Sequence, residues 1–312
     1  MDELIVREVE RDEVWFAARM TNIQFDALAA RLDSRAVMPE LATFLPSIRR
    51  RKRNADECAE LSKWLINGWS TEQLLLTNSE HLAGDALRHS LHWAFPQAYY
   101  SVFAITLAAF KARGYTETSH TAVIRKFGLE SQTGRYPSVV ACTVTGAHDR
   151  QFANVACVRN ERTLEFRADD PEMIESRLAQ FLGATRDIDL VEKKGAIHLK
   201  TKRGKRKRAF TPADWEVVSD SLGPTSLLSL LYRKRIKANY RDIDSFLSEE
   251  LEPERLYRNL LRVVGAMNCV HEAIIGQLLG VEILATTMDR MPASAASRPR
   301  TRLDHIGPLL TG

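Results

Sequence analysis

The feature that most constrains the fold is a helix-length segment, residues 97–112 (QAYYSVFAITLAAFKA), that is apolar on almost every side. Tyr99, Val102, Phe103 and Phe110 recur at the spacing of one helix face. Further apolar side chains occupy the other faces, and a single lysine carries the only charge. A helix that is apolar on most sides is buried on most sides. The segment therefore predicts a helix that runs through the middle of a bundle.

The neighbouring residues predict where helices begin and end. Gly114 follows the apolar segment where a left-handed cap is expected, because glycine has no Cβ to clash there. Thr118 or Ser119 can then accept hydrogen bonds from the first N–H groups of a second helix. Gly128 is expected to end that second helix, and Pro96 is expected in a turn before the apolar segment.

Length and composition place the chain among ordinary globular proteins. Its 312 residues, 45% apolar and 27% charged, suffice for one large core or two modest ones. No run of eighteen apolar residues is present, so no membrane span is expected. The first fifteen residues are acidic and lack an apolar signal core, which predicts a cytoplasmic location. The four cysteines lie far apart without a Cys-x-x-Cys pair, which predicts reduced thiols.

Basic charge is concentrated in three short runs. Residues 49–53, 200–208 and 233–241 together hold 17 of the 44 Lys and Arg and contain no Asp or Glu. The remaining 27 Lys and Arg face 40 Asp and Glu, a net charge of −13. Each run alone can be a solvated loop or helix face, but three runs in an otherwise acidic chain favour an anionic partner.

The residue pattern divides the chain into helical and mixed parts. Residues 1–78 are expected to form an N-terminal helical region, and helical pattern resumes from 224 to 290. Residues 129–223 predict a small α+β insertion with short Val- and Thr-rich strands, helices that begin at Asp170 and Thr211, and a strand pair with a basic tip near residue 204. Residues 291–312, rich in Pro, Ser and Arg, are expected to be a flexible tail. The predicted fold is mainly α with a small α+β insertion.

Two segments resemble the HEPN family, small helical bundles often linked to nucleotidyltransferases and to RNA-cleaving toxins. The first carries a Tyr-Tyr helix, a glycine, a Ser/Thr-His turn and a helix with Phe-Gly, here Tyr99, Tyr100, Phe103, Gly114, His120, Phe127 and Gly128. The second is LLYRKRIKANYRDIDSF, residues 230–246, with Arg235, Asn239 and Tyr240. The resemblance covers roughly residues 80–128 and 225–280 and implies a HEPN-like bundle built from 79–128 and 224–290. The family usually joins these segments by a short connection, whereas this chain places the insertion between them.

The resemblance implies two functions for the bundle. Ribonucleases of the family use an arginine and a histidine four to six residues apart, which one helix aims at the same phosphate. Here Arg235 and Asn239 are followed by Tyr240 where the histidine would stand, and a tyrosine with a pKa near 10 is a poor base at neutral pH. Members with this tyrosine are implied to be binding modules, so we expect binding rather than cleavage. The alternative is a metal-independent endoribonuclease that uses Arg235, Asn239 and Tyr240, with His120 or His271 brought in by folding.

The basic tip is the second candidate binding site. A Gly-centred hairpin can neutralise several backbone phosphates, and the expected binding residues are Lys200, Lys202, Arg203, Lys205, Arg206, Lys207 and Arg208, joined by Arg233 and Lys234. Few aromatic residues interleave with this run, so base stacking is not expected. A flexible solubilising loop remains the alternative.

The partner predicted from these features is RNA or another phosphate-rich ligand, with a homodimer formed through the bundle. A prokaryotic toxin or phage-defence role fits the resemblance, and a non-catalytic scaffold for an acidic protein remains a third alternative. No Walker loop, Gly-x-Gly-x-x-Gly or Gly-x-Ser-x-Gly occurs, and HEAII at 271–275 lacks the second histidine of a zinc protease. We therefore expect no cofactor and no metal site.

Overall fold

The computed structural model describes residues 2–52, 55–156, 165–200, 203–240 and 250–310, without the side chains of 2–12, 34, 239 and 240. The helices are α1 (Asp2–Arg31), α2 (Ser34–Phe44), α3 (Ala55–His81), α4 (Gly84–Ala112), α5 (His120–Gln132), α6 (Pro171–Ala196), α7 (Pro212–Leu222), α8 (Leu227–Tyr240), α10 (Pro253–Leu279), α11 (Glu282–Met288) and α12 (Ala293–Leu310), with a 3-10 turn at Leu45–Ser47. Three short strands, β1 (Thr143–Thr145), β2 (Gln151–Ala153) and β3 (Thr225–Ser226), complete it. The predicted mainly α fold with a small α+β insertion is confirmed.

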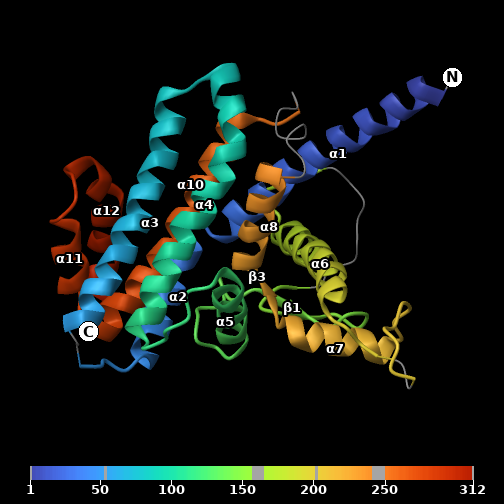
Figure 1. The fold of residues 1–312 in the computed structure, drawn as a ribbon. Helices are drawn as coiled ribbons and strands as arrows, with labels where there is room; N and C mark the ends of the chain where they lie inside the picture. Colours follow the sequence, from blue (N-terminus) through green and yellow to red (C-terminus); the bar gives the residue numbers. More distant parts are fainter. Residues whose placement is uncertain (1, 53–54, 157–164, 201–202, 241–249, 311–312) are drawn as a thin grey trace.

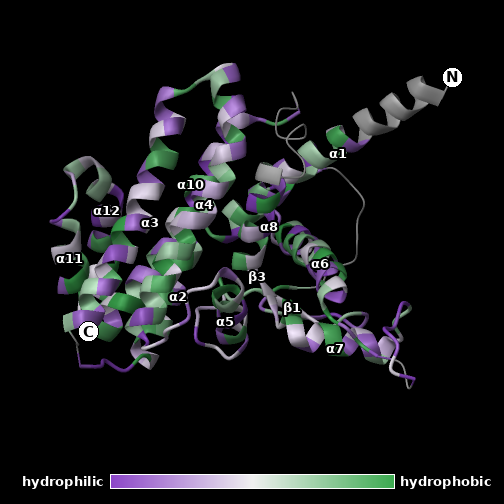
Figure 2. Ribbon diagram, viewed as in Figure 1, coloured by the Kyte–Doolittle hydropathy of each residue, from purple (hydrophilic) through white to green (hydrophobic). Residues whose placement is uncertain are grey.

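α4 is the buried centre of the bundle, as its sequence predicts. Every residue from 101 to 110 is buried, and α3, α10 and α8 pack around the helix. Figures 1 and 2 show α4 beside α3 and α10, with apolar residues along much of its length. α3 approaches closely because a Cβ on Gly68 would lie 2.6 Å from the Ile105 side chain. Pro96 lies inside α4 rather than in a turn, so the helix begins earlier than expected, at Gly84.

The connection from α4 to α5 follows the predicted signals at two of three positions. Gly114 has a φ of +84°, the left-handed conformation that glycine tolerates. Ser119 is the cap of α5, and its side chain accepts a hydrogen bond from the Ala122 N–H. Gly128 does not end α5, which continues to Gln132. Its missing Cβ instead makes room for the Pro224 carbonyl oxygen, which would lie 2.6 Å from that atom.

The insertion is folded against the bundle. Its antiparallel sheet has the order β2-β1-β3, with Thr143 opposite Ala153 on one side and Ser226 on the other. α6 packs on α1 and α8, and its Leu178, Phe181 and Leu182 belong to the main apolar core. Since β3 leads directly into α8, the sheet ties the end of the insertion to the bundle. The expected strand TLEFRA, residues 163–168, lies partly outside the described residues, and 165–168 are not a strand.

The predicted helix starts of the insertion are confirmed. Asp170 accepts a hydrogen bond from the Met173 N–H at the start of α6. Thr211 and Asp214 form a reciprocal capping box at the start of α7. Both helices have proline at the first position, where its missing N–H costs nothing.

A buried arginine holds the layers of the insertion together. The Arg186 side chain is fully buried on α6 and donates hydrogen bonds to the Gly146 carbonyl at 3.1 Å and to the Ser219 hydroxyl at 2.7 Å. It also donates to the Gly223 carbonyl at the end of α7. Arg186 therefore joins the loop after β1, α6 and α7 through hydrogen bonds to two backbone carbonyls and a side-chain hydroxyl.

Residues 293–310 form helix α12, which differs from the flexible tail expected from their composition. Arg302 on this helix donates to Glu72 on α3 at 2.7 Å and to Glu272 on α10 at 2.6 Å. Arg298 adds a bond to Glu72 at 3.0 Å, and the Trp69 indole donates to Glu272 at 2.7 Å. Both carboxylates are 1% exposed. Burial opposes the ionisation of Glu72, yet Arg302 and Arg298 hold its pKa below the ordinary value.

No helix in the described part of the chain is long and apolar enough to span a bilayer.

The buried charges predict that α12 is essential for stability. Arg302→Met would leave Glu72 and Glu272 buried without their main cation, and removing one partner of a buried pair costs about 3–5 kcal/mol. The matched control is Arg300→Met on the same helix, which removes an exposed ion pair to Asp289. This change should alter the free energy of unfolding by less than about 1 kcal/mol. Urea unfolding of the three proteins measures both values. Equal losses in the two variants would contradict the structural role of the network.

Candidate nucleic-acid interface

An aromatic cluster forms where α4, α5 and α8 meet. Tyr99 and Tyr100 come from α4, His120 is the first residue of α5, and Tyr232 and Arg235 lie one turn apart on α8. The Arg235 guanidinium carbon lies 4.9 Å from the ring centre of Tyr100 and 5.7 Å from those of Tyr99 and Tyr232. Three ring faces therefore surround one cation.

His120 is held in a fixed orientation within this cluster. Its Nδ1 shares a hydrogen bond of 2.7 Å with the Tyr99 hydroxyl, and its ring stacks on Phe103 with a centroid distance of 4.3 Å. Burial and the charge of Arg235 lower the pKa of His120. Burial also raises the pKa of Tyr99, so its hydroxyl keeps its proton. The imidazole is therefore neutral at pH 7, with Nε2 left to exchange a proton.

Arg235 is a cation with unused donors. Its Nε is buried and has no hydrogen-bond partner. Across the described residues the guanidinium forms ring contacts only, without a hydrogen bond or an ion pair. A buried polar atom without a partner calls for an explanation. A phosphate oxygen is a suitable acceptor, because its bonds to arginine are charge-assisted.

Folding brings together some of the predicted catalytic residues. Arg235 and His120 are 115 positions apart in the sequence and share contacts with Tyr99, Tyr100 and Tyr232. Asn239 and Tyr240 end α8, but their side chains lie outside the described part of the structure. Tyr232 was missed in the sequence, although its position three residues before Arg235 places both on one helix face.

His271 does not join the cluster. It is fully buried on α10, with Nδ1 2.7 Å from the Met267 carbonyl oxygen and Nε2 3.2 Å from the Thr106 hydroxyl. The rings of Phe127 and Tyr136 pack against it. Of the two histidines considered for catalysis, only His120 lies beside Arg235.

The described part of the basic run, Lys200 and 203–208, turns back on itself as a hairpin closed by one isolated β-bridge rather than by the expected strand pair. Lys200 and Arg206 pair across it, and Gly204 between them has a φ of +76°. The exposed cations at this hairpin are Lys200, Arg203, Lys205, Arg206 and Arg208. Lys207 instead bonds Asp214 at 2.7 Å and fixes the hairpin to the start of α7. Lys202 lies outside the described residues.

In the other two basic runs several cations bond to the rest of the fold, although Arg49 and Lys52 of the first run are exposed. Arg233 and Lys234, expected to bind nucleic acid, are 5% and 6% exposed. Arg233 pairs with Asp189 and, at 2.8 Å, with Glu192 on α6, and Lys234 donates to the Thr21 hydroxyl at 3.0 Å. That expectation is wrong, because α8 is packed between α4 and α6 and buries this face. In the first run, Arg50 donates to the Leu310 carbonyl and Arg51 pairs with Glu57 at 2.7 Å.

The described residues contain no group of three or more side chains placed to hold a metal ion. Comparison of the chain with protein-family models, curated proteins and solved structures gives no match. The HEPN resemblance therefore stays a prediction carried by the residues that suggested it.

The buried His271 predicts a pH-dependent stability. Burial lowers its pKa to about 4 from an ordinary value of 6.5. The unfolded state therefore takes up a proton at higher pH than the folded state, so stability is lost as the pH falls from 6.5 toward 4. Between about pH 7 and pH 5 this residue should account for a loss of about 2 kcal/mol.

Urea unfolding of the unmodified protein and of His271→Gln at both pH values tests this loss. The variant should lose about 2 kcal/mol less than the unmodified protein over the interval. His120 and the carboxylates titrate in both proteins and cancel in the comparison. An equal loss in the two proteins would mean that His271 is not held neutral.

Proposed function

We propose that this protein binds RNA, or a ligand equally rich in phosphate, through the hairpin 200–208. The observation that carries the proposal is the state of four cations, Lys200, Arg203, Arg206 and Arg208, which are exposed and have no carboxylate partner among the described residues. Other exposed cations, such as Lys63 and Arg290, also lack such a partner among the described residues, but the hairpin gathers four of them within nine positions. Exposed cations without carboxylate partners, gathered on one hairpin, suit a chain of phosphates.

The resemblance to HEPN proteins extends the proposal to its setting. We infer a cytoplasmic protein that pairs through its helical bundle and acts in a prokaryotic toxin or phage-defence system. The resemblance to HEPN proteins also favours RNA over DNA as the ligand.

Neutralising the hairpin should weaken RNA binding and its dependence on salt. Replacing Arg203, Arg206 and Arg208 with Gln removes three phosphate contacts, which should lower the slope of log affinity against log salt by about 2 for a single strand. Fluorescence anisotropy with labelled RNA from low to physiological salt measures the slope.

The matched control removes three cations elsewhere, in Lys63→Gln, Arg290→Gln and Arg300→Gln, which lie on α3 and at the C-terminal helices. Both variants lose the same net charge. A similar loss of affinity in both would mean that overall charge, and not the hairpin, attracts the RNA.

A second candidate function is metal-independent cleavage of RNA, and the contact of Arg235 and His120 with the same rings supports it. With its own proton on Nδ1, donated to the Tyr99 hydroxyl oxygen, His120 would accept the proton of a ribose 2′-hydroxyl at Nε2 as the ribose oxygen attacks the adjacent phosphorus. The bond to the 5′-oxygen breaks, the leaving oxygen takes a proton from water, and a 2′,3′-cyclic phosphate forms. Arg235 would bind the charge that develops on the phosphate oxygens.

Cleavage, if it occurs, should depend on both residues and not on a metal. Labelled single-stranded RNA and total tRNA are incubated with the protein in excess EDTA. Arg235→Ala and His120→Gln should each lower the rate at least about 100-fold, the lower limit for loss of a positioned proton-transfer group. His89→Gln on the exposed face of α4 is the control and should leave the rate unchanged. Undiminished cleavage in the two variants would mean that other residues carry the activity. Intact RNA with every protein would mean that the protein binds RNA without cleaving it.

A further inference from the structure

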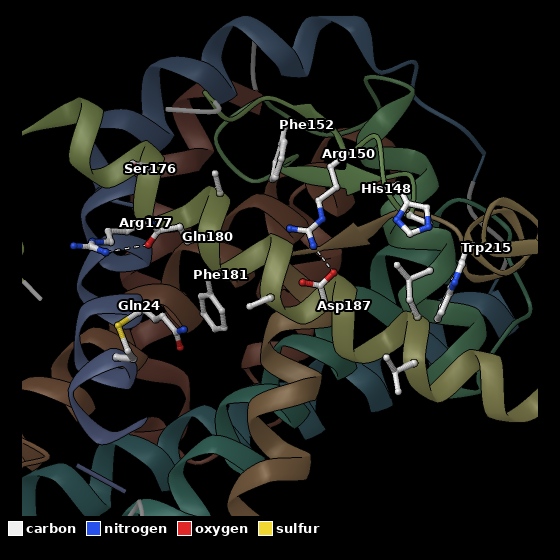
Figure 3. A pocket seen from close by; sticks show the side chains of 16 residues that line it. Gln24, His148, Arg150, Phe152, Ser176, Arg177, Gln180, Phe181, Asp187 and Trp215 are labelled. Atoms are coloured by element: carbon white, nitrogen blue, oxygen red, sulfur yellow. Dashed lines mark hydrogen bonds and ion pairs between the residues drawn. The ribbon is translucent and has the colours of Figure 1, made fainter. Parts of the chain in front are cut away.

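A cavity of about 1090 Å³ lies along α6, between α1, the β1–β2 turn and α7. Figure 3 shows His148 and Trp215 at one end, Arg150 and Asp187 in the middle, and Gln24 and Phe181 at the other end. The cavity is separate from the cluster around Arg235, and none of the predicted site residues lines it.

One end of the cavity adjoins the basic hairpin. Lys194 on α6 lies 5.0 Å from the ring centres of both Trp215 and Phe210. Phe210 is two residues beyond the last cation of the hairpin. An anionic chain bound along the hairpin therefore passes the Trp215 end of the cavity.

The cavity wall alternates aromatic rings with cationic and amide groups. His148 is exposed, while Trp215 and Phe152 are partly buried, so each presents some ring surface. Arg150 lies across α6, where a Cβ on Gly183 would be only 2.8 Å from its Nη1. Its guanidinium pairs with Asp187, so its charge is fixed on the cavity wall. Rings next to cations are the composition of sites for single-stranded nucleic acid.

The far end of the cavity holds an unused hydrogen-bond acceptor. The Gln24 side-chain oxygen is buried and has no hydrogen-bond partner. Figure 3 shows this side chain beside Phe181 at the cavity. An unpaired buried amide oxygen is costly unless a ligand or water supplies a donor. The exocyclic amino and ring N–H groups of a nucleobase are such donors.

We propose that this cavity binds an unstacked base of single-stranded RNA whose backbone lies along the hairpin, an inference that rests on the proposed RNA binding. The base inserts between the aromatic side chains and donates a hydrogen bond to Gln24. A duplex keeps its bases stacked and paired, so it reaches the hairpin cations but not the cavity. The ligand class is therefore single-stranded RNA.

The first test compares a labelled single-stranded RNA of mixed sequence with the same strand in a duplex, at one salt concentration, by fluorescence anisotropy. The single strand should bind at least about tenfold more tightly than the duplex, because insertion of a base into the cavity contributes to its affinity. Equal affinity for the single strand and the duplex would contradict base binding in the cavity and leave the RNA-binding proposal intact. Binding to neither RNA would overturn both proposals.

The second test uses Gln24→Met, which replaces an unpartnered amide with an apolar side chain of similar length and should not reduce stability. Combined with His148→Ala, it should weaken single-strand binding about tenfold and leave duplex binding and the salt slope unchanged. Gln73→Met is the matched control, because Gln73 on α3 also has a buried, unpartnered side-chain oxygen but does not line the cavity. Unchanged single-strand affinity in the Gln24 and His148 variant would contradict the proposal.

Discussion

The burial of residues 101–110 of α4 on every side is the constraint on which the structure depends. A helix segment without a solvent face needs partners all round, and the chain supplies them from segments on both sides of the insertion, α3, α8 and α10. The three fully buried polar side chains of α4 each have a partner: Ser101 bonds the Gly68 carbonyl, Thr106 contacts His271, and Tyr99 contacts His120. The last of these contacts places a histidine beside Arg235. The candidate site therefore forms where a buried polar side chain of the central helix has its hydrogen-bond partner.

Two groups of charges in the same chain serve different ends. Arg298 and Arg302 are committed to Glu72 and Glu272, and this pairing holds α12 against α3 and α10. Buried pairs of this kind specify one arrangement more than they add net stability, since burying the charges is itself costly. Lys200, Arg203, Arg206 and Arg208 are the reverse case, because they are exposed and have no carboxylate partner among the described residues. A carboxylate partner in the fold, together with the local density of basic residues, separates structural charge from candidate binding charge.

α7 connects the two surfaces proposed to meet RNA. Its first turn anchors the hairpin through Lys207 and Asp214. At its other end, a Cβ on Gly223 would lie 3.0 Å from Arg125 of α5, the helix that begins with His120. Eleven residues at 1.5 Å per residue separate these ends by about 16 Å. In this arrangement the hairpin would hold an RNA strand, the cavity beside α6 would select unpaired bases, and the Arg235 cluster would be a second phosphate contact.

The sequence by itself determined the local features: the buried α4, the caps at Ser119, Asp170 and Thr211, and the mainly α class with its small sheet. These depend on periodicity and capping, which neighbouring residues decide. Only the tertiary structure decided that Arg233 and Lys234 are buried, that residues 293–310 form a docked helix, and that Trp215 lies beside the hairpin. The sequence does not show whether a basic residue is exposed to solvent or paired with a carboxylate on a distant helix. Its partner, and therefore its role, is fixed only when the chain folds.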